Sequence, residues 1–205
     1  MRFTRPLEYI LGNKVKIAIL RYLSLTGLEL SGRQIARATA ISPPTVNRAL
    51  AELVKEGVLT QRSVGRTCLY RLNGDNRLAT DLILPLFQKE KELLKRVLCQ
   101  MLDGVPSILL AILYGSLARG EEEPFSDIDL LIVTENDDGI GVRDVLEERA
   151  VDFLKRYGNV LSFYILSLNE FRSLYHQKDE LLREILAEGR IVTGQSPLEL
   201  IHGAS

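Results

Sequence analysis

Two short apolar runs, separated by a glycine-serine pair and an acidic turn, constrain the fold more than any other feature of this chain. Ile108 to Tyr114 and Ile128 to Val133 are each long enough for a buried strand. Between them lie Gly115-Ser116 and the stretch 121–126, which has the composition of a turn. The pattern predicts two neighbouring strands whose connection carries the polar residues.

Two aspartates stand at the start of the second run. Asp127 and Asp129 are two residues apart, so in a strand both side chains point to one face. Paired carboxylates repel each other unless a cation lies between them, and Mg²⁺ binds such oxygens while taking its other ligands from phosphates and water. A glycine-serine turn brings backbone N–H groups close to a phosphate chain. The pattern therefore predicts a site for a nucleoside triphosphate (NTP) and Mg²⁺.

These motifs resemble the DNA polymerase beta type nucleotidyltransferases, most closely the minimal nucleotidyltransferase domains. The family signature is Gly-Ser followed by Asp-x-Asp on the next strand, and the segment GSLARG matches the common family form Gly-Ser-x-Ala-Arg-Gly. The resemblance covers residues 104–195. It implies that Asp127 and Asp129 are catalytic and hold Mg²⁺, and that Gly115, Ser116 and Arg119 meet the triphosphate.

The resemblance also implies a third carboxylate, on the strand that follows the next helix. We expect that helix at 142–157 and that strand at 160–166, where Ser162 takes the position of the acid. Serine cannot supply an anionic ligand or act as a base near neutral pH. A two-metal mechanism needs enough negative charge to hold both ions. We therefore expect a domain that binds a nucleotide but transfers it slowly or not at all.

Composition predicts a cytoplasmic protein with room for two small domains in 205 residues. The longest apolar run is far too short to span a membrane. No apolar segment follows Arg2 and Arg5, so we expect no signal peptide. Cys68 and Cys99 lack the spacing of a metal or redox motif.

Charge is divided unevenly between the two halves. The whole chain carries a net −1, but residues 1–75 hold 12 Lys and Arg against 5 Asp and Glu, which gives +7. Residues 76–205 hold the remaining 14 and 22, which gives −8. This division predicts that the first half meets a polyanion and the second does not.

The basic half has the pattern of a winged helix-turn-helix. Helical spacing and capping residues predict helices from residue 7 or 13 to 25, over 32–38 and over 43–56. Two strand-like runs, 58–62 and 68–72, follow and form the wing. The arrangement resembles the winged helix domains of small prokaryotic transcription regulators, which implies binding to double-stranded DNA.

In such domains the second helix of the motif lies in the major groove, where its side chains reach base edges and phosphates. The wing arginines would meet phosphates or a minor groove. The predicted DNA-binding residues are Ser42, Thr45, Asn47, Arg48, Arg62 and Arg66. The alternatives are that these arginines form a solvated face, or that the domain docks onto a protein.

A linker helix is expected between the domains. Residues 77–102 read as one long helix that Pro85 kinks or interrupts. Such a helix can pair with a second copy, and winged helix regulators bind two half-sites as dimers, so we expect a homodimer. The predicted organisation is a winged helix at 1–75, the linker at 76–103, a nucleotidyltransferase-like α/β domain with a mixed sheet at 104–195, and a loose tail at 196–205. The fold class is α+β.

Three functions are compatible with this sequence. The first is a DNA-binding transcription regulator whose nucleotidyltransferase-like domain binds nucleotide and metal and is weakly active or inactive. The second is an active enzyme that moves a nucleoside monophosphate from an NTP to a hydroxyl on protein, RNA or a small molecule. The third is the antitoxin of a toxin-antitoxin pair, which requires a cognate protein partner. The apparent loss of the third carboxylate favours the first.

Overall fold

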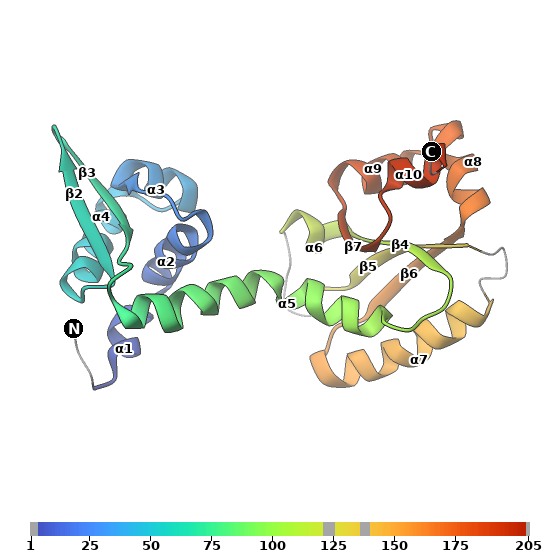
Figure 1. Ribbon diagram of the computed structural model, residues 1–205, viewed down its shortest axis with the longest axis horizontal. Helices are drawn as coiled ribbons and strands as arrows, with labels where there is room; N and C mark the ends of the chain where they lie inside the picture. The colour runs from blue at the N-terminus through green and yellow to red at the C-terminus, as the bar shows by residue number, and fades with distance from the viewer. Residues whose placement is uncertain (1–3, 121–125, 136–139, 204–205) are drawn as a thin grey trace. The chain divides into compact units, whose positions relative to one another are not determined.

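The chain folds into two compact units that meet in sequence between Leu94 and Lys95. The computed structural model describes residues 4–120, 126–135 and 140–203 (Figure 1). The first unit contains a three-stranded sheet with helices, and the second contains a four-stranded mixed sheet with helices. The predicted α+β class, with an N-terminal winged helix and a C-terminal mixed-sheet domain, is confirmed.

The N-terminal unit has the helices and the hairpin of a winged helix. Its antiparallel sheet has the order β1-β3-β2, and residues Gly65 and Arg66 separate the two wing strands. The two-residue strand β1 was not predicted. The elements are α1 (Pro6–Ile10), α2 (Lys14–Thr26), β1 (Leu30–Ser31), α3 (Gly32–Thr39), α4 (Pro43–Lys55), β2 (Leu59–Val64) and β3 (Thr67–Leu72).

Local capping residues set the helix boundaries in this unit. The side chain of Asn13 accepts a hydrogen bond from the Lys16 N–H at 2.9 Å, which starts α2 at the second of the two predicted positions. Ser31 and Gln34 form a capping box at the start of α3. Ser42 occupies the N-cap of α4 as predicted, but its hydroxyl bonds the Thr45 hydroxyl at 2.8 Å instead of a backbone N–H.

The long helix between the motifs begins with a wider turn. Residues Ala79–Ile83 are π-helical, and α5 (Leu84–Leu102) continues directly from them. The Leu84 N–H bonds the Ala79 carbonyl, five residues back. Pro85 has no N–H to donate, so the wider turn just before it adapts the backbone to the missing hydrogen bond. The predicted interruption at Pro85 is therefore a local change of helix type.

The C-terminal unit is built around a sheet of order β6-β5-β4-β7, in which β5 and β6 are parallel and the other pairs antiparallel. The strands predicted around the aspartates and around Ser162 are present. The elements after α5 are β4 (Ile108–Tyr114), α6 (Gly115–Arg119), β5 (Ile128–Thr134), α7 (Ile140–Tyr157), β6 (Leu161–Ser167), α8 (Leu168–Gln177), α9 (Glu180–Glu188), β7 (Arg190–Gly194) and α10 (Pro197–His202).

Helices cover both faces of this sheet (Figure 1). On one face, alternate residues of the strands pack with Phe171 of α8 and with Leu182 and Ile185 of α9 in a buried core. On the other face lie α7 and the last turns of α5, where the Arg149 guanidinium donates to the carbonyls of Met101 and Asp103. Asp129 and Ser162 belong to the first face. Asp129 is two residues before Leu131 on β5 and Ser162 is four residues before Leu166 on β6, and side chains an even number of residues apart on a strand share a face.

The expectation of a loose tail from residue 196 is wrong for the described part of that segment. Ser196 and Glu199 form a capping box that starts α10. Leu200 and Ile201 are buried in the core of the C-terminal unit, and the Arg172 guanidinium donates to the Leu200 carbonyl at 2.7 Å. The sequence shows only a short amphipathic segment here, and the face that it covers is visible only in the fold.

Across the described ranges, none of the helices combines the length and the apolar character that crossing a membrane requires.

Candidate functional site

Several of the residues predicted to bind nucleotide and metal meet at one end of the C-terminal sheet. Asp129 on β5 is the register partner of Tyr114 at the end of β4 and of Ser162 near the start of β6. Residues in register on neighbouring strands project from the same face. Asp129 is half-buried, whereas Asp127 is exposed just before the strand begins. The structure therefore gathers Asp129, Ser162 and Tyr114 into one row across three strands.

Gly115 lies directly against the Asp129 carboxylate. Its φ is 75°, in the left-handed region that glycine adopts without strain. A Cβ built on Gly115 would collide with Oδ2 of Asp129. Only glycine lets the backbone approach the carboxylate this closely, so the Gly-Ser turn and the aspartate are parts of one site.

Burial and repulsion destabilise the charged form of Asp129. Burial raises the pKa of its carboxyl group, and the neighbouring Asp127 charge adds to this increase. Burial also raises the pKa of the Tyr114 phenol, with further contributions from Asp129 and from Tyr164. A cation held between the two carboxylates would reverse this effect, because it favours their charged forms.

No third acid joins this pair among residues 4–120, 126–135 and 140–203: they contain no group of three His, Cys, Asp or Glu side chains able to hold a metal ion. Ser162 stands at the register position where the family resemblance placed the third carboxylate. The acidic turn that the sequence predicted at 121–126 lies outside the described residues except for Ser126. Among the described residues, the site thus presents two carboxylates and a serine hydroxyl.

The remaining nucleotide-binding candidates lie on α6. Ser116 is half-buried in the first turn of this short helix, which follows β4 without a break. Arg119 at its last turn lies 3.4 Å from the Glu188 carboxylate at the end of α9. Glu188 was not predicted as part of this region, because nothing in the sequence relates two residues so far apart. Its charge offsets the cation that was expected to face the triphosphate.

On the winged helix, the predicted DNA-contacting side chains of α4 are exposed. Ser42, Thr45, Asn47 and Arg48 all face solvent, while Val46, Ala49, Leu50 and Leu53 are buried. The Asn47 carboxamide oxygen packs against Gly32 at the start of α3. This exposed surface of α4 is available to a groove of DNA.

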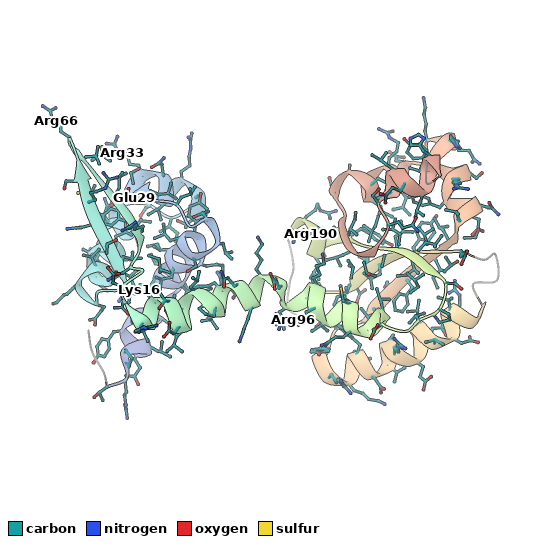
Figure 2. The ribbon with its side chains drawn as sticks, in the orientation of Figure 1. Lys16, Glu29, Arg33, Arg66, Arg96 and Arg190 are labelled. Carbon is teal, nitrogen blue, oxygen red and sulfur yellow. The ribbon has the colours of Figure 1, made fainter. Side chains whose placement is uncertain are left out.

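The two wing arginines differ in their surroundings. Arg66 lies at the tip of the β2–β3 hairpin (Figure 2). Arg62 instead makes a two-pronged contact with the Glu29 carboxylate, with its Nε 3.2 Å from one oxygen. This pairing raises the pKa of Arg62 and lowers that of Glu29. Glu29, which the sequence did not single out, therefore neutralises one of the two predicted wing cations.

Comparison with known families agrees with this arrangement. Residues 97–197 match the family model described as polymerase beta, nucleotidyltransferase, and residues 13–60 match the model described as winged helix-turn-helix DNA-binding. The chain joins a winged helix-turn-helix to a polymerase beta nucleotidyltransferase domain. The match of the nucleotidyltransferase domain begins within α5 and ends at the start of α10.

Solved structures resemble parts of the chain. A crystal structure of a toxin-antitoxin with AMP-PNP is 17% identical, covers 52% of this chain and 80% of its own, and has a TM-score of 0.39. The homodimeric winged helix-turn-helix DNA-binding domain from Mycobacterium bovis is 23% identical. The match covers 46% of this chain and 81% of that domain, with a TM-score of 0.35. The antimony-specific transcriptional repressor AntR is 21% identical. The match covers 44% of this chain and 76% of the repressor chain, with a TM-score of 0.37. No curated protein matches the chain in sequence.

Proposed function

We propose that this protein is a DNA-binding transcription regulator whose nucleotidyltransferase domain binds a Mg²⁺–NTP complex and transfers nucleotide very slowly or not at all. The observation that carries the proposal is the register of Asp129 with Ser162. The carboxylates of Asp127, just before β5, and of Asp129, on β5, are present, while the neighbouring strand offers a neutral hydroxyl at the position that matches Asp129. A domain of this kind retains binding and lacks the charge that transfer needs.

The metal part of the proposal follows from a count of charge. Asp127 and Asp129 together carry two negative charges when ionised, which neutralise one Mg²⁺ but not a pair of metal ions. The raised pKa of Asp129 marks a carboxylate that is desolvated and repelled in the protein alone. One Mg²⁺ between Asp127 and Asp129, shared with the phosphates, would remove this repulsion. Bound Mg²⁺ would supply charge neutralisation at the triphosphate.

The nucleotide part rests on the contact between Gly115 and Asp129. Because the backbone at Gly115 lies against the carboxylate, a phosphate that reaches the metal also reaches the first turn of α6. The backbone N–H groups there and the Ser116 hydroxyl are the donors that would hold it. Arg119, whose Nη1 lies 3.4 Å from the Glu188 carboxylate, would add a cation at this end of the site.

The DNA part rests on the exposed face of α4 and on the charge of the N-terminal half. The +7 carried by residues 1–75 supplies the attraction to phosphates, which depends on salt but not on sequence. Asn47 and Arg48 are the side chains of α4 that would contact base edges. The wing tip at Arg66 would meet the backbone or the minor groove.

We also propose that the regulator acts as a homodimer. Leu82, Leu86 and Leu93 follow one another along the helix and expose 52%, 47% and 57% of their surface. Such a row of exposed leucines on one helix is typical of a surface that another protein covers. A second copy would place two α4 helices on a symmetric operator. The oligomeric state in solution, measured by light scattering, tests this part.

The second candidate function is an active transferase. The observation in its favour is that the Gly115-Ser116 turn and both aspartates are present in one site. In that case Asp127 and Asp129 would hold Mg²⁺ for transfer to a hydroxyl acceptor, and the winged helix would deliver the enzyme to its substrate. The antitoxin function stays a prediction from the sequence.

Equilibrium dialysis tests the proposed binding function. The full-length protein is equilibrated with each labelled NTP in the presence and in the absence of Mg²⁺. We expect saturable binding that requires Mg²⁺ and is lost in Asp129→Asn, whereas Asp152→Asn, an exposed acid of α7, binds like the wild type. Binding of no triphosphate under any condition would contradict the proposal.

A further inference from the structure

A pocket lies on the C-terminal unit, on the side of the sheet opposite Asp129. It has a volume of about 310 Å³ and opens to solvent between the last turns of α5 and α7. This volume is at the lower end of the range of small-molecule sites. All of its lining residues fall between Val97 and Tyr157, so it belongs to one unit of the chain. Neither the metal nor the DNA proposal uses it.

The floor of this pocket is apolar. Met101 from α5 and Phe153 from α7 line it, with exposed fractions of only 9% and 5%. Tyr157 forms one wall, and its ring centroid lies 4.7 Å from that of Phe153. Because Tyr157 is 49% exposed, its ring offers a free surface to a ligand. An aliphatic or aromatic group would bury apolar surface here.

Four charged residues line the pocket, but two of them are already engaged. The Arg149 guanidinium donates to the carbonyls of Met101 and Asp103, both at 2.6 Å, and so fixes the end of α5 against α7. The Asp152 carboxylate accepts from Lys155 at 3.3 Å. Arg149 thus joins the two walls, whereas the Asp152–Lys155 pair lies within α7.

The other two charged groups are free to meet a ligand. Within the described ranges, neither the Arg156 guanidinium nor the Asp103 carboxylate has a hydrogen-bond or ion-pair partner. The pocket therefore presents one uncommitted cation and one uncommitted anion above an apolar floor. Both groups are exposed and hydrated in the protein alone, so a ligand that carries both charges can pair with both of them at once.

We propose that this pocket binds a small zwitterion with an apolar side chain, of the α-amino acid class. Its carboxylate pairs with the Arg156 guanidinium, which can bind both oxygens at once. Its ammonium group pairs with the Asp103 carboxylate, and its side chain lies on Met101, Phe153 and Tyr157. This pocket is separate from the nucleotide site, so binding of an amino acid here does not depend on the proposed function.

Isothermal titration of the full-length protein with L-phenylalanine and L-leucine tests this inference. We expect saturable binding of at least one of them. We also expect that phenethylamine, which lacks the carboxylate, and 3-phenylpropionate, which lacks the amine, each bind about tenfold or more weakly than L-phenylalanine, because each loses a charged hydrogen bond. Arg156→Gln should weaken binding of the amino acid to a similar degree. Arg143→Gln, on the same helix but outside the pocket and paired with Glu147 at 4.0 Å, should leave it unchanged.

Three results would overturn the inference. The first is no saturable binding of either amino acid by the wild type. The second is equal affinity in Arg156→Gln and Arg143→Gln. The third is binding of 3-phenylpropionate or phenethylamine as tight as that of L-phenylalanine, which would assign the pocket to a simple anion or a simple cation.

Discussion

Ser162 is the direct neighbour of Asp129 across the parallel pair of β5 and β6. In that register, the serine hydroxyl and the carboxylate project from the same face of the sheet, beside each other at its end. The spacing of adjacent strands therefore sets the distance between the side chains of Ser162 and Asp129 that a shared cation would bridge. A substitution at Ser162 therefore changes the charge beside Asp129, within the proposed metal site.

Restoring an acid at this position is the first test. Ser162→Asp should tighten Mg²⁺ binding, since the site gains a third carboxylate, and it should raise nucleotide transfer. General base catalysis typically contributes about 10²–10⁴-fold, so even a partial effect is measurable with an NTP labelled on the α-phosphate.

Ser173→Asp is the matched control for that variant, because it adds the same charge on the exposed surface of α8. It should change neither Mg²⁺ affinity nor transfer. Identical Mg²⁺ affinities in Ser162→Asp, Ser173→Asp and the wild type would show that Ser162 does not belong to the metal site.

Gly115→Ala and Gly120→Ala form a second matched pair. Both glycines have a positive φ, 75° and 76°, so each substitution introduces the same backbone strain, of about 1–2 kcal/mol. At Gly120 no atom of the described residues lies within 4 Å of the new Cβ, whereas at Gly115 the Cβ meets the Asp129 carboxylate. Gly115→Ala should therefore lose Mg²⁺–NTP binding and Gly120→Ala should keep most of it, as measured by equilibrium dialysis. Equal losses would mean that strain alone matters.

The raised pKa of Asp129 predicts how stability depends on pH. Because the pKa in the folded protein is above the unfolded value, Asp129 contributes most to stability when it is protonated, and this contribution is lost as the pH rises through the raised pKa. Asp129→Asn removes this loss. In the absence of Mg²⁺, the variant should have a higher melting temperature than the wild type near pH 7, and the difference should shrink toward about pH 4.

Mg²⁺ should reverse the order of the melting temperatures of the wild type and Asp129→Asn. It should raise the melting temperature of the wild type by mass action on the folded state and leave Asp129→Asn unaffected. A wild-type melting temperature that ignores Mg²⁺, with and without NTP, would contradict a metal site at these aspartates.

The pairing of Arg62 with Glu29 predicts an unequal contribution of the wing arginines to DNA binding. Arg66→Ala should weaken binding to duplex DNA uniformly across sequences and reduce the dependence of log K on log salt by about 1. Glu29→Gln should tighten binding, since it removes the acid that offsets Arg62. Gel shifts at several salt concentrations measure both. Weaker binding by Glu29→Gln would mean that the pair holds the wing in its bound shape.

Much of this architecture follows from local sequence patterns. The spacing of Asp127 and Asp129, the glycine-serine turn and the apolar runs around them were enough to predict two neighbouring strands. The family resemblance that they carry then placed a third strand, with Ser162 beside the aspartates. Ser31 and Asn13 start helices because their side chains bond backbone N–H groups only a few residues away. Such short-range signals are readable without a structure.

The contacts that the sequence did not reveal all join distant segments. Glu29 meets Arg62, Glu188 meets Arg119, and Leu200 receives a hydrogen bond from Arg172. Glu29 and Glu188 each offset the charge of an arginine that was predicted to bind a phosphate. The Arg172 contact helps to order a segment that was expected to be a loose tail. Long-range pairs of exposed ions leave no periodic pattern in the chain, so only the fold identifies them.

Transfer of the α-phosphate label tests the central claim most directly. The full-length protein is incubated with Mg²⁺ and each NTP labelled on the α-phosphate, together with protein, RNA and small-molecule acceptors, and covalently transferred label is measured against Asp129→Asn. We expect transfer by the wild type at or barely above the level of the variant, although the wild type binds the same triphosphates. Rapid, Mg²⁺-dependent transfer by the wild type that is absent in Asp129→Asn would contradict it and identify the protein as an active nucleotidyltransferase.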